Sequence, residues 1–551
     1  MRKNKGITLI ALVITIIILL ILSGISISAL TNQGLFKNAK LAKEKAEKEQ
    51  KKETSLLDQY ESELNKYVEN GRWDGKVNKP ELMTGMSAIK FTDPTNSAEG
   101  TTVDTTSNDT EWYNYEDKKW ANAKTEDGSM WVWIPRYAYR IHKENGVETQ
   151  KFDVVFLVGL TDTYYDENGK LQTAQRQTSE DQTIVTNGDT YTVHPAFTNE
   201  SSINYANGGW DAELAGIWVA KFEAGYASGN NSATVKASSV NYSQDTAYVP
   251  AVETGTTTTT ATARNWLDGE YGSTTTAIKY PTFQGLTYSM NYINHNDVYR
   301  ISKVLTESGN IYGLSSNSTD SHLMKNSEWG AVLYLSQSKY GLDGTEIVIN
   351  SVYLNNTTKS IYAVTGCASS TADASAVSTT IGALNNRTQS SVYVWTQKNG
   401  TAASSTGTIY GIYDMSGGIS ERTSSLINNK NNNLKTYGSQ IIADLNNGKS
   451  TKYITIYPTG ETLGQTMAQA SQANYTNNTK IYGDAIKETS TLGTGTNSWY
   501  SDCSDFVGLS TPFFLHGGYY GGTSISGCFA FGRTSGNGSY NRGFRSVIVS
   551  L

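Results

Sequence analysis

The chain has 551 residues, more than one ordinary domain, and a formal net charge of −6. No basic stripe follows the N-terminal region, which excludes nucleic acid as a partner because phosphate binding requires clustered lysine and arginine. Charged residues make up only 17% of the chain, and 50 glycines and 35 tyrosines accompany many serines, threonines and asparagines, which predicts a turn-rich, β-heavy, extracellular body.

The first predicted element is a membrane-spanning helix. No charged residue occurs over residues 7–30, and at about 1.5 Å per residue this run is long enough to cross a hydrocarbon core of about 30 Å. Arg2, Lys3 and Lys5 precede it, so the N-terminus is expected in the cytoplasm and the remaining chain outside. Apolar residues at helical spacing predict that the helix continues to residue 70.

Three interpretations of this N-terminus are open: a prepilin leader, an uncut membrane anchor, and a cleaved signal peptide ending near Ala29. The basic peptide 1–6, ending at Gly6 and followed by Ile7, resembles the N-terminus of type IV prepilins. The resemblance implies cleavage after Gly6, methylation of Ile7, and a pilin-like helix over residues 7–70. Pilins usually have glutamate at the fifth mature position, where this chain has Ala11, which favours a minor, tip-placed subunit or one that never assembles.

The remaining chain is expected to consist of a connector and one large domain. Residues 71–127 are polar with scattered turn signals and are predicted to be the connector. The domain is predicted over residues 128–551. Stretches with few apolar residues near residues 161–209 and 225–285 are expected to be insertions on its surface.

Within this domain the sequence predicts strands and one clear helix. Aromatic and β-branched residues over 130–140, interrupted by Pro135, predict two short strands with a break, and residues 215–223 predict another strand. The helix is predicted over residues 323–340, where Trp329 belongs to an apolar face.

Three motifs occur in order along this domain. They are Ser-Glu-Trp-Gly-Ala at 327–331, Tyr-Gly-Ile-Tyr-Asp-Met-Ser-Gly-Gly at 410–418, and His-Gly-Gly at 516–518 with Gly-Phe-Arg at 543–545. Together they resemble the formylglycine-generating-enzyme-like branch of the C-type lectin fold. The fold class is therefore expected to be α+β: a long N-terminal pilin-like helix followed by a C-type lectin fold domain with β-rich insertions.

The catalytic members of that family bind copper through two cysteines spaced C-x4-C after the Gly-Gly pair. Gly522 and Gly527 fall at those positions here, and Cys528 is one position away. Gly418 replaces a usual asparagine, and Ser420 and Arg422 stand where tryptophans are common around Glu421. No catalytic residue is therefore expected, and the protein is not expected to be an enzyme.

Metals and disulfides are not predicted by the remaining cysteines and histidines. Cys367, Cys503 and Cys528 form no C-x-x-C pair, and the five histidines are scattered. This pattern predicts no metal site and no cofactor, and it allows one disulfide with one free thiol.

The segment 516–541 has the composition of a recognition surface. It contains no Lys, Glu, Gln, Met or Trp, and its Tyr, Ser, Asn and Gly residues are those that antibody loops use for contact and adaptable hydrogen bonds. We expect an exposed ligand-binding face, with Phe529, Phe531 and Phe544 packed inward and Arg545 in a structural role. The ligand-binding residues are predicted to be Tyr519, Tyr520, Thr523, Ser524, Ser526, Arg533, Thr534, Ser535, Asn537, Ser539, Tyr540 and Asn541.

This segment also resembles the variable region of proteins diversified by retroelements. Those proteins use a C-type lectin fold and concentrate substitutions between the Gly-Gly and Gly-Phe-Arg motifs at adenine-rich codons. Mutation of the adenines in AAC-type codons cannot yield the five residue types that are absent here. The resemblance implies a diversified binding face.

We therefore expect a receptor or adhesin on a bacterial cell surface, as a minor or tip pilin-like subunit. Its expected partners are an unknown protein or glycan ligand, the membrane, other pilin subunits and a prepilin peptidase. One alternative is a structural pilus or pseudopilus subunit with a decorative body. The other is an enzyme related to formylglycine-generating oxidases.

Overall fold

A computed structural model gives the structure of the protein, whose chain divides into two compact units, residues 1–73 and 74–551. The structure describes residues 43, 77–91, 100–105, 112–176, 190–199, 208–226, 280–285, 287–290, 293–350, 363–364, 366–367, 393–395, 400–427, 429, 431–446, 451–457, 470–478, 482–519, 521–539 and 541–551. The predicted leader 1–6 and the helix 7–70 lie outside these residues, apart from Lys43. Within the ranges just given, no helix combines the length and the apolar character needed to cross a bilayer.

The predicted α+β fold class is wrong, because the described part of the chain is β-rich. It contains short strands throughout and only five short α-helices, with no long N-terminal helix among the described residues. The helices are α4 (His295–Ser302), α5 (Asn326–Ser336), α6 (Asn432–Tyr437), α7 (Ser439–Asn446) and α8 (Ser471–Asn477). The prediction gave most weight to one N-terminal helix, whereas the many β-branched and aromatic residues of the body form sheets.

The largest sheet has seven antiparallel strands in the order β14-β23-β10-β4-β3-β1-β2. The predicted strands at 130–140 and 215–223 are present, since β4 ends at Pro135 and β5 begins at Tyr137. The stretch predicted as a connector contributes β1, β2 and β3. The strands of this sheet are β1 (Ser87–Lys90), β2 (Thr101–Thr102), β3 (Asn122–Lys124), β4 (Met130–Pro135), β10 (Gly216–Ala220), β14 (Thr319–Leu323) and β23 (Ser546–Ser550).

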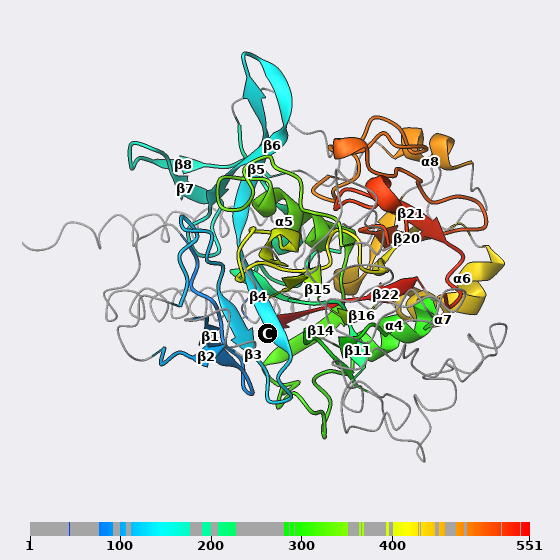
Figure 1. Ribbon diagram of the computed structural model, residues 1–551, viewed down its shortest axis with the longest axis horizontal. Helices are drawn as coiled ribbons and strands as arrows, with labels where there is room; N and C mark the ends of the chain where they lie inside the picture. The colour runs from blue at the N-terminus through cyan, green and yellow to red at the C-terminus, as the bar shows by residue number, and fades with distance from the viewer. Residues whose placement is uncertain are drawn as a thin grey trace, which may run out of the picture. The chain divides into compact units, whose positions relative to one another are not determined.

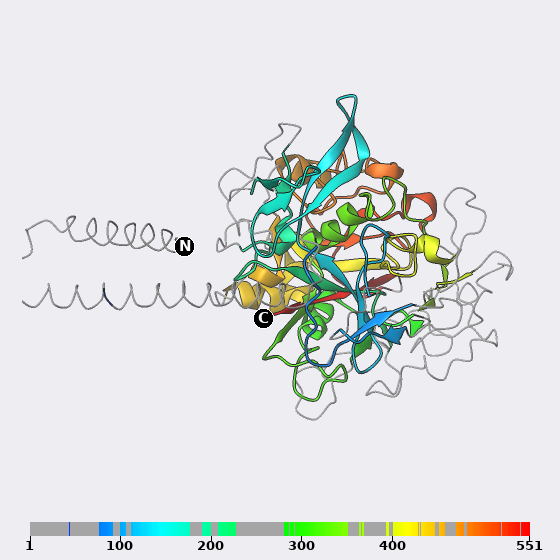
Figure 2. The same cartoon turned by 90° about the vertical axis from the view of Figure 1, so that its left-hand side faces the viewer.

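A long hairpin extends from this body (Figures 1 and 2). Its strands β5 (Tyr137–Glu144) and β6 (Val147–Phe156) are joined by Asn145 and Gly146, both at positive φ, as a two-residue hairpin turn requires. β9 (Thr192–Val193) pairs with the other edge of β5. A smaller hairpin of β7 (Thr163–Tyr165) and β8 (Leu171–Thr173) lies within the predicted insertion 161–209.

The remaining strands form one five-stranded sheet and three small pairs. The five-stranded sheet has the order β19-β18-β20-β21, and β22 pairs with β18. Its strands are β18 (Ser420–Ile427), β19 (Thr455–Tyr457), β20 (Phe513–His516), β21 (Phe531–Thr534) and β22 (Arg542–Phe544). The pairs are β11 (Gly225–Tyr226) with β12 (Pro281–Thr282), β13 (Thr287–Tyr288) with β16 (Gly366–Cys367), and β15 (Ala363–Val364) with β17 (Tyr393–Val394).

The α5 helix connects the three sequence motifs. It covers 326–336 of the predicted 323–340, and it is buried on every side rather than along one face. The Trp329 indole stacks on the His516 ring at 5.0 Å between centroids and donates to the Cys528 carbonyl at 3.2 Å. The Gly417 amide donates to the Gly517 carbonyl at 2.8 Å. The motifs therefore meet in one core beneath the C-terminal segment.

Candidate ligand-binding surface

The C-terminal segment follows one edge of the five-stranded sheet. β20 and β21 are antiparallel, with Phe513 opposite Thr534 and His516 opposite Phe531. The loop 517–530 therefore leaves one end of these strands and the loop 535–541 the other, about 10 Å away for strands of four residues. The predicted binding residues consequently form two patches joined by β21, the edge strand of this sheet among the described residues.

The first loop is held from beneath by a buried carboxylate. Asp502 is fully buried and accepts the backbone amides of Gly527 and Phe529, each at 3.0 Å. The Cys503 amide donates to the Ile525 carbonyl at 2.9 Å. A loop with its backbone hydrogen-bonded in this way keeps a defined conformation without a ligand. Asp502 lies outside the segment and was not predicted from the sequence.

The side chains of the first loop divide between the surface and the interior. Tyr519 and Ser524 are half-buried, and Ile525 is 38% exposed at the end of the 3₁₀ helix Thr523–Ile525. The prediction for Ser526 is corrected, because Ser526 is buried and its hydroxyl accepts the Tyr519 amide at 3.2 Å. Ser526 therefore supports the loop from within.

The edge strand carries one surface ion pair. The Arg533 Nε donates to Asp505 Oδ2 at 3.0 Å, and both side chains are 37% exposed. Arg533 also donates to the Ser471 hydroxyl. The prediction for Thr534 is corrected, since Thr534 is buried and its hydroxyl accepts from the Gly536 amide at 3.1 Å and from Arg542 at 2.8 Å.

The second loop presents small polar side chains. The Ser535 hydroxyl donates to Asn537 Oδ1 at 2.8 Å, and the Ser539 hydroxyl donates to Asn541 Oδ1 at 2.7 Å. Asn537 is exposed and the other three are half-buried. The Asn541 carbonyl accepts the Ser420 amide at 3.0 Å, which fixes the loop to β18.

Some predicted residues lie outside the described part of the chain, and the inward packing of three phenylalanines is confirmed. Tyr520, Tyr540 and the side chain of Thr523 lie outside the described residues, as do the processing residues Gly6 and Ile7. Phe529, Phe531 and Phe544 are at most 1% exposed, so the prediction that they pack inward is confirmed.

The predicted structural role of Arg545 agrees with its contacts. Its guanidinium is fully buried, pairs with Glu421, and donates to the Ala220 and Tyr413 carbonyls, each at 2.8 Å. The contact to Glu421 joins β18 to the residue that follows β22, beneath the second loop.

Two buried basic residues beside the second loop were not predicted from the sequence. Arg422 on β18 donates to the carbonyl of Asn537, and the His295 amide donates to the carbonyl of Gly536 at 2.8 Å. Both side chains are fully buried. The one signal for Arg422 was its place at a position where the resembled family has tryptophan.

Two described cysteines lie near this surface, and neither is part of a disulfide. Burial raises the pKa of the Cys503 thiol to about 11. A thiol with so high a pKa is a poor nucleophile. Among the residues that the structure describes, no group of three His, Cys, Asp or Glu side chains could hold a metal ion.

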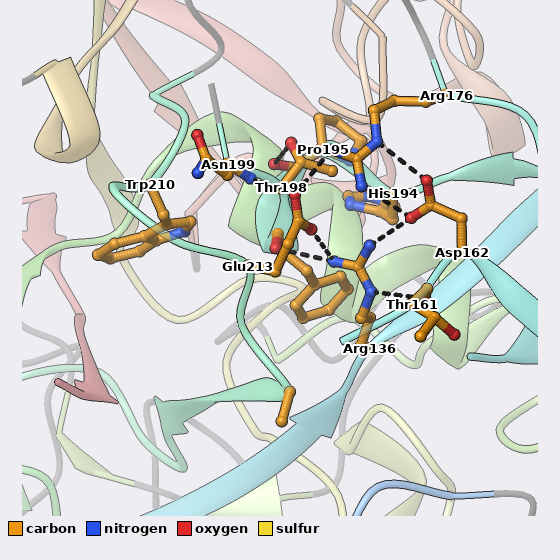
Figure 3. Close-up of polar contacts among 12 residues, drawn as sticks. Arg136, Thr161, Asp162, Arg176, His194, Pro195, Thr198, Asn199, Trp210 and Glu213 are labelled. Atoms are coloured by element: carbon orange, nitrogen blue, oxygen red, sulfur yellow. Dashed lines mark hydrogen bonds and ion pairs between the residues drawn. The ribbon is translucent and has the colours of Figure 1, made fainter. Parts of the chain in front are cut away.

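A second polar cluster holds the β7–β8 hairpin to the body (Figure 3). Arg136 is buried between Asp162, at 2.7 Å, and Glu213, at 2.5 Å. Arg176 contacts the same two carboxylates at 2.8 and 2.7 Å. Two guanidinium groups thus balance two carboxylates. This balance indicates a structural clamp, and the cluster offers no unpaired charge to a ligand.

Comparison with known proteins adds no identity to this geometry: no protein-family model matches the chain, and no curated protein matches it.

Proposed function

We propose that this protein is a receptor or adhesin displayed on the cell surface, whose segment 516–541 recognises a ligand. One observation supports this most directly: Ser524, Ser535, Asn537, Ser539 and Asn541 remain at least partly exposed on loops that buried residues hold in place. Hydroxyl and amide groups form adaptable hydrogen bonds, and a loop that is already ordered loses little entropy on binding.

The N-terminal sequence supports display outside the cell. In this proposal the apolar run 7–30 anchors the chain in the membrane, and a peptidase cleaves after Gly6. Mass spectrometry of the mature protein tests this step directly. A methylated Ile7 is expected, whereas a mature N-terminus at Ala29 or later would contradict the prepilin-like processing.

The binding surface is tested with the full-length protein in detergent micelles on an array of neutral and acidic oligosaccharides. We expect the double variant Tyr519→Ala, Asn537→Ala to lose at least tenfold in affinity, which is about 1.4 kcal/mol. The matched control is Tyr165→Ala, because Tyr165 is a 44% exposed tyrosine on the β7–β8 hairpin.

The Tyr165→Ala control shows whether the loss of affinity is specific to segment 516–541 or follows from removing any exposed tyrosine. Unchanged thermal unfolding of both variants is expected, since Tyr519 is half-buried and Asn537 is exposed. An equal loss in the Tyr165→Ala control would contradict the proposal, and binding to no oligosaccharide would exclude a glycan as the ligand.

A further inference from the structure

One cationic side chain at the second loop has no counter-ion among the residues that the structure describes. Arg422 is fully buried, and its Nε and Nη1 have no hydrogen-bond partner among the described residues. Its remaining described contact is the donation from Nη2 to the Asn537 carbonyl. Burying an ionised group without an opposite charge costs several kcal/mol, so this arginine requires an explanation.

The strand register places a second guanidinium on the same face of the sheet. β18 and β22 are parallel, with Ser420 opposite Arg542 and Arg422 opposite Phe544. Since alternate residues of a strand share a face, Arg422 and Arg542 point to the same side. Glu421 immediately precedes Arg422 on β18 and therefore points to the other side, where it pairs with Arg545.

The described groups around Arg422 do not balance its positive charge. Burial and the nearby charge of Arg542 lower the pKa of Arg422 well below its usual value. The His295 ring stacks on Phe513 at 4.0 Å, and neither ring nitrogen has a hydrogen-bond partner in the described part of the chain. Burial, and secondarily Arg422, lower the pKa of His295. No carboxylate is among the described groups that shift the pKa of Arg422.

The second loop connects this buried group to the surface. The Asn537 carbonyl accepts from Arg422, and its side-chain Oδ1 accepts from Arg542 Nη1 at 3.1 Å. Asn537 is exposed and Arg542 is half-buried. Gly536 precedes Asn537 at φ 103° and Gly538 follows it, so the backbone here is free to adjust to an entering group.

We propose that Arg422 and Arg542 bind an oxyanion, a carboxylate, sulfate or phosphate group, which enters beside Asn537. Paired guanidinium donors are well matched to the planar or tetrahedral oxygens of such groups. The anion supplies the negative charge that would balance Arg422. This inference rests on the proposed function in one respect: it makes an acidic group the part of the recognised ligand that binds at the second loop.

The experiment uses anions alone as probes, so it does not depend on the natural ligand. Thermal unfolding of the full-length protein in micelles is measured with 0–20 mM sodium phosphate, sulfate or glucuronate, with sodium chloride added to hold the ionic strength constant. We expect a saturable rise in Tm of about 2 °C or more in the wild type. The sulfate and glucuronate arms distinguish tetrahedral oxyanions from carboxylates.

Two variants and one control decide the outcome. Arg422→Met is expected to abolish the rise in Tm, and Arg533→Met is expected to retain it, because Arg533 is already paired with Asp505. Asn537→Asp places a carboxylate within reach of Arg542, so it is expected to raise the Tm without added anion and to remove the response. This second variant keeps the test decisive if Arg422→Met does not fold.

Two results would overturn the inference. One is a wild-type Tm that does not depend on the anion at constant ionic strength. The other is an equal response in all variants, which indicates the general stabilisation that sulfate and phosphate give to any protein. Failure here leaves the oligosaccharide test unaffected, since neutral ligands and the Tyr519→Ala, Asn537→Ala variant report on the binding surface independently.

Discussion

Removal of Arg545 tests whether the C-terminal segment rests on a buried ion pair. The Arg545 Nη2 lies 2.5 Å from Glu421 Oε1, its Nε lies 2.8 Å from Oε2, and the two side chains are 0% and 1% exposed. Glu223 and Asp414 add further negative charge near the pair. Arg545→Met therefore leaves a buried carboxylate without its cation and removes one donor from each of two backbone carbonyls.

The expected cost at pH 7 is about 4 kcal/mol, since removing one partner of a buried pair typically costs about 3–5 kcal/mol. In the variant, Glu421 takes up a proton rather than remain charged in the interior, so the cost depends on pH. Burial already raises its pKa in the wild type, although Arg545 opposes the shift. For an unfolded pKa of about 4.3, protonation costs about 3.7 kcal/mol at pH 7 and about 1 kcal/mol at pH 5.

The sign of the pH dependence follows from this shift. A carboxyl group whose pKa is raised on folding stabilises the protein below its unfolded pKa, and this stability is lost as pH rises through the folded pKa. The penalty of Arg545→Met is therefore expected to fall by about 2–3 kcal/mol between pH 7 and pH 5. Urea unfolding followed by tryptophan fluorescence measures it. The double variant Arg545→Met, Glu421→Gln is expected to cost less than the single variant and to lose the pH dependence of the penalty.

The reasoning would be refuted by a penalty below about 1 kcal/mol at pH 7, by a penalty that does not change between pH 7 and pH 5, or by a double variant as unstable as Arg545→Met alone. Each result would show that the Glu421 carboxylate, left without its cation, is not the cause of the instability.

Two further predictions concern other buried charges. Burial raises the pKa of Glu488 to about 7, and hydrogen bonds from Tyr139 and Tyr334 oppose the shift. The free energy of unfolding is therefore expected to fall by about 3 kcal/mol as pH rises from about 4.5 to 7. Glu488→Gln should flatten this part of the Tm–pH profile, and an unchanged profile would exclude Glu488 as its cause. Arg136→Met is expected to lower the free energy of unfolding by about 3 kcal/mol because the side chain is fully buried. Arg176→Met should lower it by at most about 1 kcal/mol because Arg176 is 39% exposed. Equal urea midpoints for the two variants would contradict the structural role of this buried cluster.

The strands of the body could be predicted because their signals are local. Aromatic and β-branched residues before and after Pro135 indicate two strands, and β4 and β5 have those bounds within a few residues. The predicted helix at 323–340 is shorter at both ends, because Leu323 ends β14 and regular helix stops at Ser336. The inward packing of Phe529 and Phe531 was predicted from their alternation with smaller residues, and both are buried.

The candidate site could be predicted only in part, because the fate of a polar side chain depends on distant partners. Ser526 and Thr534 resemble their exposed neighbours in sequence, yet their hydroxyls satisfy an amide and a guanidinium inside the fold. Arg422 joins the second loop only through the parallel pairing of β18 with β22, which spans about 120 residues of sequence. Local pattern contains no information on such a register.

The place of β23 in the large sheet has a consequence for biosynthesis. β23 lies between β14 and β10, and Trp218 pairs with Ile548, which is 548 − 218 = 330 positions later. At about 5–20 residues per second, a ribosome needs roughly 15–65 s to make this interval. Throughout that time the edge of β10 that β23 will cover has no such partner, and an unpaired strand edge is a template for aggregation. We therefore expect the nascent chain to require a chaperone until β23 has been synthesised.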